Sequence, residues 1–285
     1  MSKSILIAGC GFVGLPLARS FASSGWQTCA ITASESKASN LRHEPFRIAA
    51  IDIADRASFR RLASVRFDVV VHCASSGRGD ASAYAAVYLL GAQNLLDHFQ
   101  PGRFILAGST SVYAQTDGSR VDEESAAEPL RETAKVLRGT EDLVLGTGGS
   151  VARLAGLYGP GRCVPLQKLL AGQAVIEGEG ERVMNMVHQV DAVVALRFLI
   201  ENDQTGIFNV VDNEPVPQRD WFLWVCERLK KALPPYGPRD LTRKRGWTNK
   251  RVSNQKLRSL GWQPRYPTFR EGIAEIIAVP GTGET

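Results

Sequence analysis

The sequence predicts an α/β fold in which a doubly wound parallel sheet is covered by helices on both faces. Near the N-terminus, the apolar run Ile5–Ile7 leads into three glycines spaced Gly9-x-Gly11-x-x-Gly14 and then into a helical pattern. Phe67–Cys73 is a continuous apolar run, typical of a strand that is buried on both faces. Strands alternate with helical patterns over the first half of the chain, which favours parallel strands joined by right-handed crossovers.

Each further element is predicted from its own apolar pattern. After the first strand, strands are expected at Thr28–Thr32, Arg47–Ile51, Phe67–Cys73, Arg103–Ala107, Ser150–Leu154 and Gly206–Val211. After the first helix, helices are expected at Ala57–Ala63, Ala81–Phe99, Leu130–Leu145, Val164–Leu170, Asp220–Lys231 and Glu271–Ile277. The alternation loosens after Gly156, so a sheet domain is expected over residues 1–155 with a return segment near 187–212. A smaller C-terminal lobe is expected over 156–186 and 213–285, with a frayed tail from Val279.

The glycine loop predicts a site for a dinucleotide. Gly9 allows a sharp turn off the strand, Gly11 lets backbone amides approach a pyrophosphate, and Gly14 lets the helix pack closely on the strand. The pyrophosphate would lie on the helix N-terminus, beside Phe12 and Val13, where free amides and the helix dipole favour an anion. The alternative is a tight turn that binds nothing, but the strand before it and the helix after it favour cofactor binding. The predicted fold is therefore of the Rossmann type.

Composition places the chain among ordinary globular proteins. The 285 residues are 44% hydrophobic and 22% charged, and no apolar stretch is long enough to span a bilayer. The first strand begins directly after Met1–Lys3, which leaves no room for a signal peptide, so a cytoplasmic location is expected. Five scattered cysteines show no metal-ligand spacing and are expected to be buried thiols. Among them, Cys163 has no histidine at a spacing that suggests a nucleophile.

The net charge of +5 is concentrated in one segment. Between Arg239 and Arg258 there are eight lysines or arginines and a single acid. Because aromatic residues are not interleaved in this segment in a recognised nucleic-acid-binding pattern, a solvated face is favoured over nucleic-acid binding. Within it, Lys250 or Arg251 could hold a phosphate or carboxylate of a substrate, with charged surface as the alternative.

Several motifs in the same order resemble those of the extended short-chain dehydrogenase/reductase family, in its epimerase/dehydratase branch. Asp52–Ile53 looks like the family's acidic segment at the adenine, and His72–Ala74 like the strand end that covers the cofactor. Gly108–Tyr113 is similar to the strand that carries the active-site serine. Arg153–Gly161 and Asn185–Asp191 are similar to the strand and loop after the catalytic helix and to the segment that returns to the sheet. The resemblance implies that Asp52, Ile53, Cys73 and Ala74 contact the cofactor.

The chain departs from this family at its acid–base pair. Family members carry a Tyr and a Lys one helical turn apart, so that the ammonium lowers the pKa of the phenol. An alignment on Pro129 and Glu141 puts Thr133 at the Tyr position and Leu137 at the Lys position. A shift of two residues offers Arg131 and Lys135, which restores a cation but no phenol, and no tyrosine occurs between Tyr113 and Tyr158. The pair is therefore expected to be absent.

Three hydroxyl side chains are the candidates for catalysis. Ser109 matches the family's serine and could bind a substrate oxygen, with a hydrogen bond to backbone as the alternative. Thr133 has a hydroxyl at the Tyr position, although its pKa is too high for a good proton carrier. Tyr113 could replace the missing phenol, as could Tyr158, but structural aromatic residues are the favoured interpretation.

His188 and Asp191 are a further candidate acid–base pair. The favoured alternative is that they tie the returning segment to the sheet, because a lone histidine is more often a structural residue with a hydrogen bond.

The end of the second predicted strand bears on the choice between NAD and NADP. An acid there would bind the ribose 2′-hydroxyl of NAD. The sequence instead has Thr32 and Ser34, with Lys37 and Arg42 nearby, which favours NADP. Glu35 could still serve NAD.

Two functions are compatible with these observations. The first is an NAD(P)-dependent epimerase-like or reductase-like enzyme that acts on a nucleotide sugar or another small carbonyl compound. The second is a regulatory or sensing module that binds NAD(P) without chemistry. Neither a metal, a nucleic acid nor a membrane is expected as a partner. The family resemblance implies a homodimer through helices 81–99 and 130–145, with Val87, Val136 and Leu143 as candidate contacts.

Overall fold

The computed structural model describes residues 3–62, 65–77, 79–242 and 247–278. The predicted frayed tail from Val279 lies outside them. A seven-stranded parallel sheet forms the centre of the fold, in the order β12-β7-β5-β4-β1-β2-β3. Its strands are β1 (Ser4–Ala8), β2 (Gln27–Thr32), β3 (Arg47–Ala50), β4 (Val69–His72), β5 (Arg103–Ser109), β7 (Ser150–Leu154) and β12 (Gly206–Val210). The predicted α/β, doubly wound parallel fold is confirmed.

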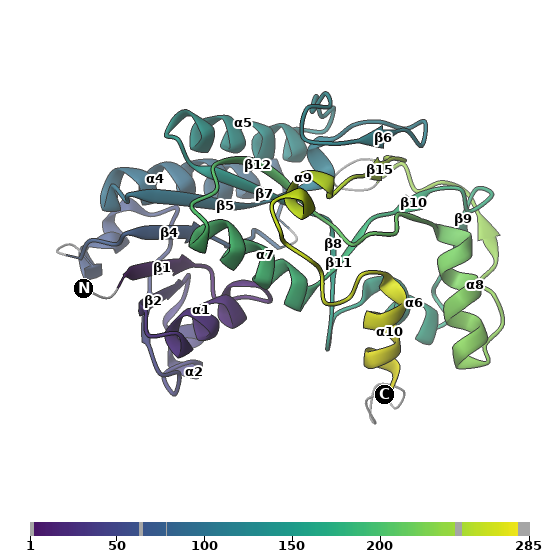
Figure 1. Ribbon diagram of the computed structural model, residues 1–285, viewed down its shortest axis with the longest axis horizontal. Coiled ribbons are helices and arrows are strands. Elements are labelled where there is room, and N and C mark those ends of the chain that lie inside the picture. Colours follow the sequence, from purple (N-terminus) through teal and green to yellow (C-terminus); the bar gives the residue numbers. More distant parts are fainter. Residues whose placement is uncertain (1–2, 63–64, 78, 243–246, 279–285) are drawn as a thin grey trace.

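The helices that cover the sheet form a layer on each side of it (Figure 1). On one side lie α1 (Gly14–Ser23) and α7 (Gln189–Glu201). On the other side lie α5 (Glu132–Gly146) and a long helical rod made of α3 (Ala81–Tyr84), a π-helical segment (Ala85–Leu90) and α4 (Gly91–Phe99). A short helix, α2 (Glu35–Asn40), joins β2 to β3 at the edge of the sheet.

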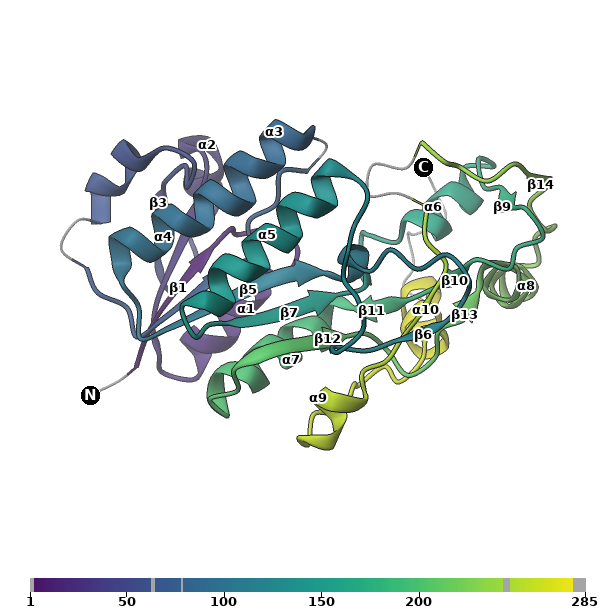
Figure 2. The same ribbon diagram turned by 90° about the horizontal axis from the view of Figure 1, so that it is seen from above.

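The remaining elements form a region beyond the carboxyl ends of the sheet strands (Figure 2). Four pairs of short strands belong to it. They are β6 (Arg120–Val121) with β15 (Arg251–Val252), β8 (Gly156–Tyr158) with β11 (Met186–His188), β9 (Ile176–Glu177) with β14 (Tyr236–Gly237), and β10 (Val183–Met184) with β13 (Val216–Pro217). Its helices are α6 (Val164–Leu170), α8 (Gln218–Leu229), α9 (Gln255–Ser259) and α10 (Phe269–Ala278).

The hydrophobic core is divided in the same way. Two clusters of buried residues pack against the central sheet. A third cluster draws all its buried members from Tyr158 onward and surrounds Trp221 and Phe269, both fully buried. The second region therefore has apolar packing of its own, from which its loops extend to the sheet.

Apart from the short helices α2 and α9, which no prediction covered, three helical elements differ from the sequence-based expectation. The α-helix expected at Ala57–Ala63 is a 3₁₀ helix at Arg56–Leu62, and Ala63 lies outside the described residues. The helix expected over Ala81–Phe99 is interrupted by the π-helical segment, whose Val87 carbonyl lies 3.0 Å from Nε2 of the buried His72. A π-turn shifts the backbone ladder by one residue, and such turns are frequent at functional sites.

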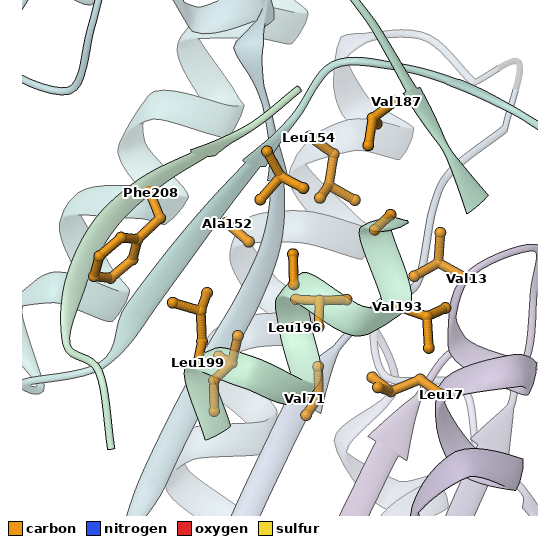
Figure 3. Packing of buried hydrophobic residues seen from close by; sticks show 14 of the residues in the cluster. Val13, Leu17, Val71, Ala152, Leu154, Val187, Val193, Leu196, Leu199 and Phe208 are labelled. Atoms are coloured by element: carbon orange, nitrogen blue, oxygen red, sulfur yellow. The ribbon is translucent and has the colours of Figure 1, made fainter. Parts of the chain in front are cut away.

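The third difference is α7, which no helical prediction covered. Its side chains Val193, Leu196 and Leu199 point at the sheet and at α1, where they meet residues such as Leu17 and Phe208 (Figure 3). A helix buried over so much of its surface lacks the polar stripe that marks a surface helix. It connects β11 to β12 and thereby returns the chain to the sheet.

Candidate functional site

A cavity of about 1100 Å³ opens at the carboxyl ends of the central strands. It runs from Thr32 and Lys37 beside the edge of the sheet, past the glycine loop, to Ser109 and then to Arg182 in the second region. In open α/β sheets, ligands bind in this crevice, where the strand order reverses. The order β5-β4-β1-β2-β3 reverses at β1 and β4, directly below the loop.

The glycine loop has the geometry that a pyrophosphate requires. Gly9 has φ +107°, and a Cβ there would lie 2.5 Å from the backbone of Ala74. A Cβ at Gly14 would collide with the carbonyl oxygen of Gly9, whereas a Cβ at Gly11 would meet nothing within 4 Å. No side chain caps α1, and its first turn has no acid. The amides at this helix end are thus available to an anion.

The predicted loop residues Gly9, Gly11, Phe12 and Val13 all line the cavity, together with Cys10. Gly14 supports the loop from behind, because its α-carbon faces Gly9.

The sheet-edge end of the cavity carries most of the residues predicted to contact the adenosine. Thr32, Asp52 and Ile53 line it, as does Lys37. Ser34 does not; its hydroxyl accepts a hydrogen bond from the Lys37 amide at 3.4 Å and caps α2.

Glu35, the candidate acid for a ribose 2′-hydroxyl, is ion-paired with Arg61 on the surface. Arg61 also donates to the carbonyl of Ala50 at 3.0 Å, which holds that pair beside β3.

The strand end of β4 supplies an apolar wall. Cys73 and Ala74, which the family resemblance placed at the cofactor, line the cavity. Burial raises the pKa of the Cys73 and Cys10 thiols to about 12, so both thiols remain protonated at neutral pH. They are therefore small apolar groups in this wall rather than nucleophiles.

Ser109 lies at the carboxyl end of β5 and lines the cavity. Its hydroxyl oxygen accepts a hydrogen bond from the Ser111 amide at 3.2 Å, which orients the side chain at the strand end. Opposite, α5 contributes Leu137 to the lining, while Thr133 is buried outside it. The position aligned with the family's lysine thus presents an aliphatic side chain to the cavity.

Tyr113 lies outside the cavity lining. Its hydroxyl donates to the Asp122 carbonyl at 2.7 Å and lies 3.0 Å from Oδ1 of Asn209. The guanidinium of Arg153 stacks on its ring at 4.7 Å from the centroid. Tyr158 does line the cavity, and its buried hydroxyl has no hydrogen-bond partner among the described residues. Burial raises the pKa of that phenol, so it stays neutral.

His188 and Asp191 are arranged at the start of α7. Nδ1 of His188 accepts a hydrogen bond from the Val190 amide at 3.3 Å. The Asp191 carboxylate accepts from the amides of Arg265 and Tyr266 at 2.6 and 3.1 Å. His188 thereby caps the start of α7, and Asp191 joins this helix to the segment at Arg265 and Tyr266.

The basic residues singled out in the sequence point elsewhere. Lys250 is buried and donates to the Tyr113 carbonyl at 2.8 Å and to the Thr248 hydroxyl at 2.9 Å. Arg251 lines a separate, smaller cavity beside β15. Cys163 is buried at the start of α6, and burial raises the pKa of its thiol to about 11. Arg243 and Lys244, within the basic segment, lie outside the described residues.

A model of the NAD dependent epimerase/dehydratase family matches residues 5–210. The chain belongs to this family. Protein YeeZ of Escherichia coli K12 is 30% identical to it, over 93% of this chain and 97% of YeeZ. The 3-diazoavenalumate denitrifying reductase of a Streptomyces species is 28% identical, over 94% of this chain and 98% of the reductase. The dTDP-glucose 4,6-dehydratase of Bacillus anthracis, solved in complex with NAD, shares the fold with a TM-score of 0.80 at 17% identity, covering 97% of this chain and 96% of that one.

The cavity fits the cofactor of this NAD-dependent family. The unfilled space at Gly11 admits a phosphate against the backbone, and the uncapped start of α1 supplies amides to it. In the part of the chain that the structure describes, no group of histidines, cysteines and acids could hold a metal ion. None of the described helices is both long and apolar enough to cross a bilayer.

Sequence patterns did not identify several residues of the cavity that lie in the second region, away from Thr32 and Lys37. Arg162 and Arg182 line it, with Met184, Asn185 and Met186. Arg162 lies over the ring of Phe12 at 5.0 Å from the centroid. The signal that could have found Arg162 is its place directly after the Gly159–Gly161 loop, whereas no local pattern marks Arg182.

Proposed function

We propose that this protein is an NADP-dependent reductase-like enzyme for a small carbonyl compound or a nucleotide sugar. The observation that carries this proposal is one continuous cavity that joins the glycine loop to Ser109. A cofactor with its pyrophosphate on the loop would extend toward Ser109 along the carboxyl ends of β1, β4 and β5. The name of the Streptomyces relative, a reductase, supports this class of reaction.

The reaction would proceed without the phenol–ammonium pair. When bound, the nicotinamide supplies or accepts a hydride. Ser109 would donate a hydrogen bond to the substrate oxygen, because it is a hydroxyl at the end of β5 that faces the cavity. Leu137 would pack against the cofactor and exclude water from one side. The proton that completes reduction would come from solvent, since the described lining offers no phenol at the position of Thr133.

The preference for NADP rests on the sheet-edge end of the cavity. Lys37 lines it, and an ammonium beside the adenosine ribose would attract a 2′-phosphate. Glu35, which would repel that phosphate, is ion-paired with Arg61 instead. Thr32 replaces the acid that an NAD site places at the end of the second strand.

Two measurements test this proposal together. Calorimetric titration with NADPH and NADH should show binding of both, with NADPH bound more tightly. The protein–NADPH complex is then mixed with each compound of a panel of carbonyl compounds and nucleotide sugars. Absorbance at 340 nm should fall with at least one of them, because NADPH is oxidised. Binding of neither cofactor at millimolar concentration would overturn the proposal entirely, and tighter binding of NADH would overturn the choice of NADP.

A regulatory module that binds NADP without chemistry is the second candidate. The aliphatic Leu137 in the cavity lining favours it, because loss of a positioned proton carrier typically costs a factor of about 10² to 10⁴ in rate. Tight cofactor binding with no oxidation of NADPH across the whole panel would select this function over the enzyme.

We also propose a homodimer through α5 and the helical rod at residues 81–99. Val87, Val136 and Leu143, the contacts expected from the sequence, are partly buried because they also pack against the protein's own core. Leu89 and Leu90 are instead 39% and 46% exposed on the rod. Sedimentation equilibrium should give twice the 31.0 kDa chain mass, and Leu89→Lys with Leu90→Lys should give the monomer.

A further inference from the structure

Arg182 is a largely buried cation whose side chain forms no hydrogen bond with the described part of the chain. It directly precedes β10, and its side chain is 17% exposed and lines the cavity. Within residues 3–62, 65–77, 79–242 and 247–278, no acceptor lies in hydrogen-bond geometry with its guanidinium, and its Nε is fully buried without a partner. Buried polar groups are nearly always satisfied, and a guanidinium has five N–H donors. Such a group calls for an acceptor that the chain itself does not supply.

The nearest carboxylate compensates the charge only in part. Oε2 of Glu177 lies 3.6 Å from Nε of Arg182, beyond hydrogen-bond distance. The same oxygen accepts a hydrogen bond from Nε1 of Trp247 at 3.2 Å. Glu177 is therefore shared with another donor, and the hydrogen-bonding capacity of Arg182 remains unused.

Glu177 does not line the cavity, and the charged residues that line it near Arg182 are cations. Arg162 lines the same cavity, and its guanidinium lies over the Phe12 ring without a hydrogen bond or an ion pair to another described residue. Asp52 is the one acid in the described lining, and it lies beside β3 at the opposite end. Figure 2 shows that β3 and β10 lie in different parts of the molecule.

The buried Lys250 adds a further positive charge. Its pKa is lowered to about 7 by burial and by the nearby charge of Arg182. An anion bound at Arg182 would counter the repulsion between the two cations, because opposite charge favours the charged form of each group.

We infer that Arg182, assisted by Arg162, binds an anionic group of the substrate and is a specificity-determining residue of this site. A carboxylate or a phosphate would fit, because either accepts two parallel hydrogen bonds from one guanidinium. This inference rests on the proposed function, since it assigns the substrate end of the same cavity. It excludes neutral carbonyl compounds as the preferred substrates.

Binding of defined probes to the protein saturated with NADPH tests the inference. UDP-glucose provides a diphosphate, benzoate provides a carboxylate, and benzamide is the neutral counterpart of benzoate. The variants are Arg182→Gln and Arg182→Lys. Arg219→Gln is the matched control, because Arg219 is exposed on α8 in the same region and does not line the cavity.

At least one anionic probe should bind, and Arg182→Gln should weaken it by about tenfold or more, as expected for a lost charge-assisted hydrogen bond. Arg182→Lys should restore part of the affinity, and Arg219→Gln should leave the affinity unchanged. Benzamide, which carries no charge, should bind to the wild type and to Arg182→Gln no more tightly than benzoate binds to Arg182→Gln. The probe that responds tells a diphosphate from a carboxylate.

Equal binding of every probe by the wild type and by Arg182→Gln would overturn the inference. Failure of the wild type to bind either anion at about 10 mM would overturn it as well. NADPH binding must be unchanged in Arg182→Gln. If the wild type fails to bind NADPH, the proposed function fails instead, so the two failures are distinguishable.

Discussion

The carboxylate of Glu141 accepts two hydrogen bonds from the guanidinium of Arg153, at 2.9 Å from Nε and 2.7 Å from Nη2. Both side chains are buried, and the pair joins α5 to β7 beneath the ring of Tyr113. Because α5 carries Leu137 to the cavity, this pair fixes the distance between that wall and the sheet. A buried, bidentate pair is costly to break from one side.

Glu141→Gln should therefore lower the free energy of unfolding by about 3 to 5 kcal/mol, because it leaves a buried guanidinium without its counter-charge. Urea denaturation followed by circular dichroism measures this. Glu132→Gln, which removes an exposed pair with Lys135, is the control and should cause little change. Equal stability of the two variants would show that Arg153 finds another partner.

Two glycines of the loop should respond differently to alanine. Gly11→Ala should have a free energy of unfolding within about 0.5 kcal/mol of the wild-type value, because open space surrounds its Cβ. The same substitution should weaken NADPH binding by at least about tenfold, because the added methyl group would contact the pyrophosphate. Gly14→Ala should destabilise the fold itself, because its Cβ would collide with the Gly9 carbonyl. Thermal unfolding and calorimetry separate the two effects. Unaltered cofactor affinity in Gly11→Ala would place the pyrophosphate elsewhere.

Ser109→Ala should reduce kcat by about 10²-fold, the usual cost of a lost hydrogen bond to a reacting oxygen, while the Kd for NADPH stays the same. Ser111→Ala is the matched control, because the Ser111 side chain is close in the chain but outside the cavity lining. Steady-state kinetics with the substrate found in the panel measure both. A similar loss in both variants would indicate damage to the strand end rather than to catalysis.

Lys37→Gln should weaken NADPH binding by about tenfold and leave NADH binding unchanged, because only NADPH carries the 2′-phosphate. Lys3→Gln removes a surface lysine that lies over Trp26, away from the cavity, and should affect neither cofactor. Fluorescence titration measures the dissociation constants of NADPH and NADH for each variant and for the wild type. A parallel loss for NADH would mean that Lys37 contacts a part common to both.

The protein should lose stability as the pH falls from about 6.5 to 4, in part through His72. Burial lowers the pKa of His72 to about 4 from an ordinary 6.5, so within this window the unfolded chain takes up a proton that the folded one refuses. The stability present above pH 6.5 is thereby lost on acidification, by up to about 3 kcal/mol. His72→Gln, compared at pH 7 and 4.5, should lose less stability than the wild type, and exposed His43→Gln should lose as much. No difference between His72→Gln and His43→Gln would contradict this.

The glycine-loop end of the cavity could be predicted from the sequence because its determinants are local. The spacing of Gly9, Gly11 and Gly14 dictates a strand–turn–helix geometry that depends on neighbours within a few residues. The same holds for Ser109, which needs only the end of a strand. These residues line or support the cavity as the pattern indicates.

The Arg182 end of the cavity could not be predicted, because it depends on how distant segments meet. Arg182 faces the cavity only through the pairing of β10 with β13, which local patterns do not reveal. Likewise α7 is buried on most sides and shows no amphipathic stripe. The π-helical segment depends on His72, which lies 15 residues from Val87 in sequence.

Tyr158, part of the cavity wall, has the backbone of Gly272 packed against its hydroxyl, so closely that any side chain at position 272 would collide with it. Gly272 belongs to α10, the final helix of the described chain. A ligand bound near Arg182 would therefore contact a wall that is supported by residues more than a hundred positions after Tyr158 in the sequence. Ligand binding should accordingly respond to the docking of α10, so that truncation of this helix would disturb the cavity at Tyr158.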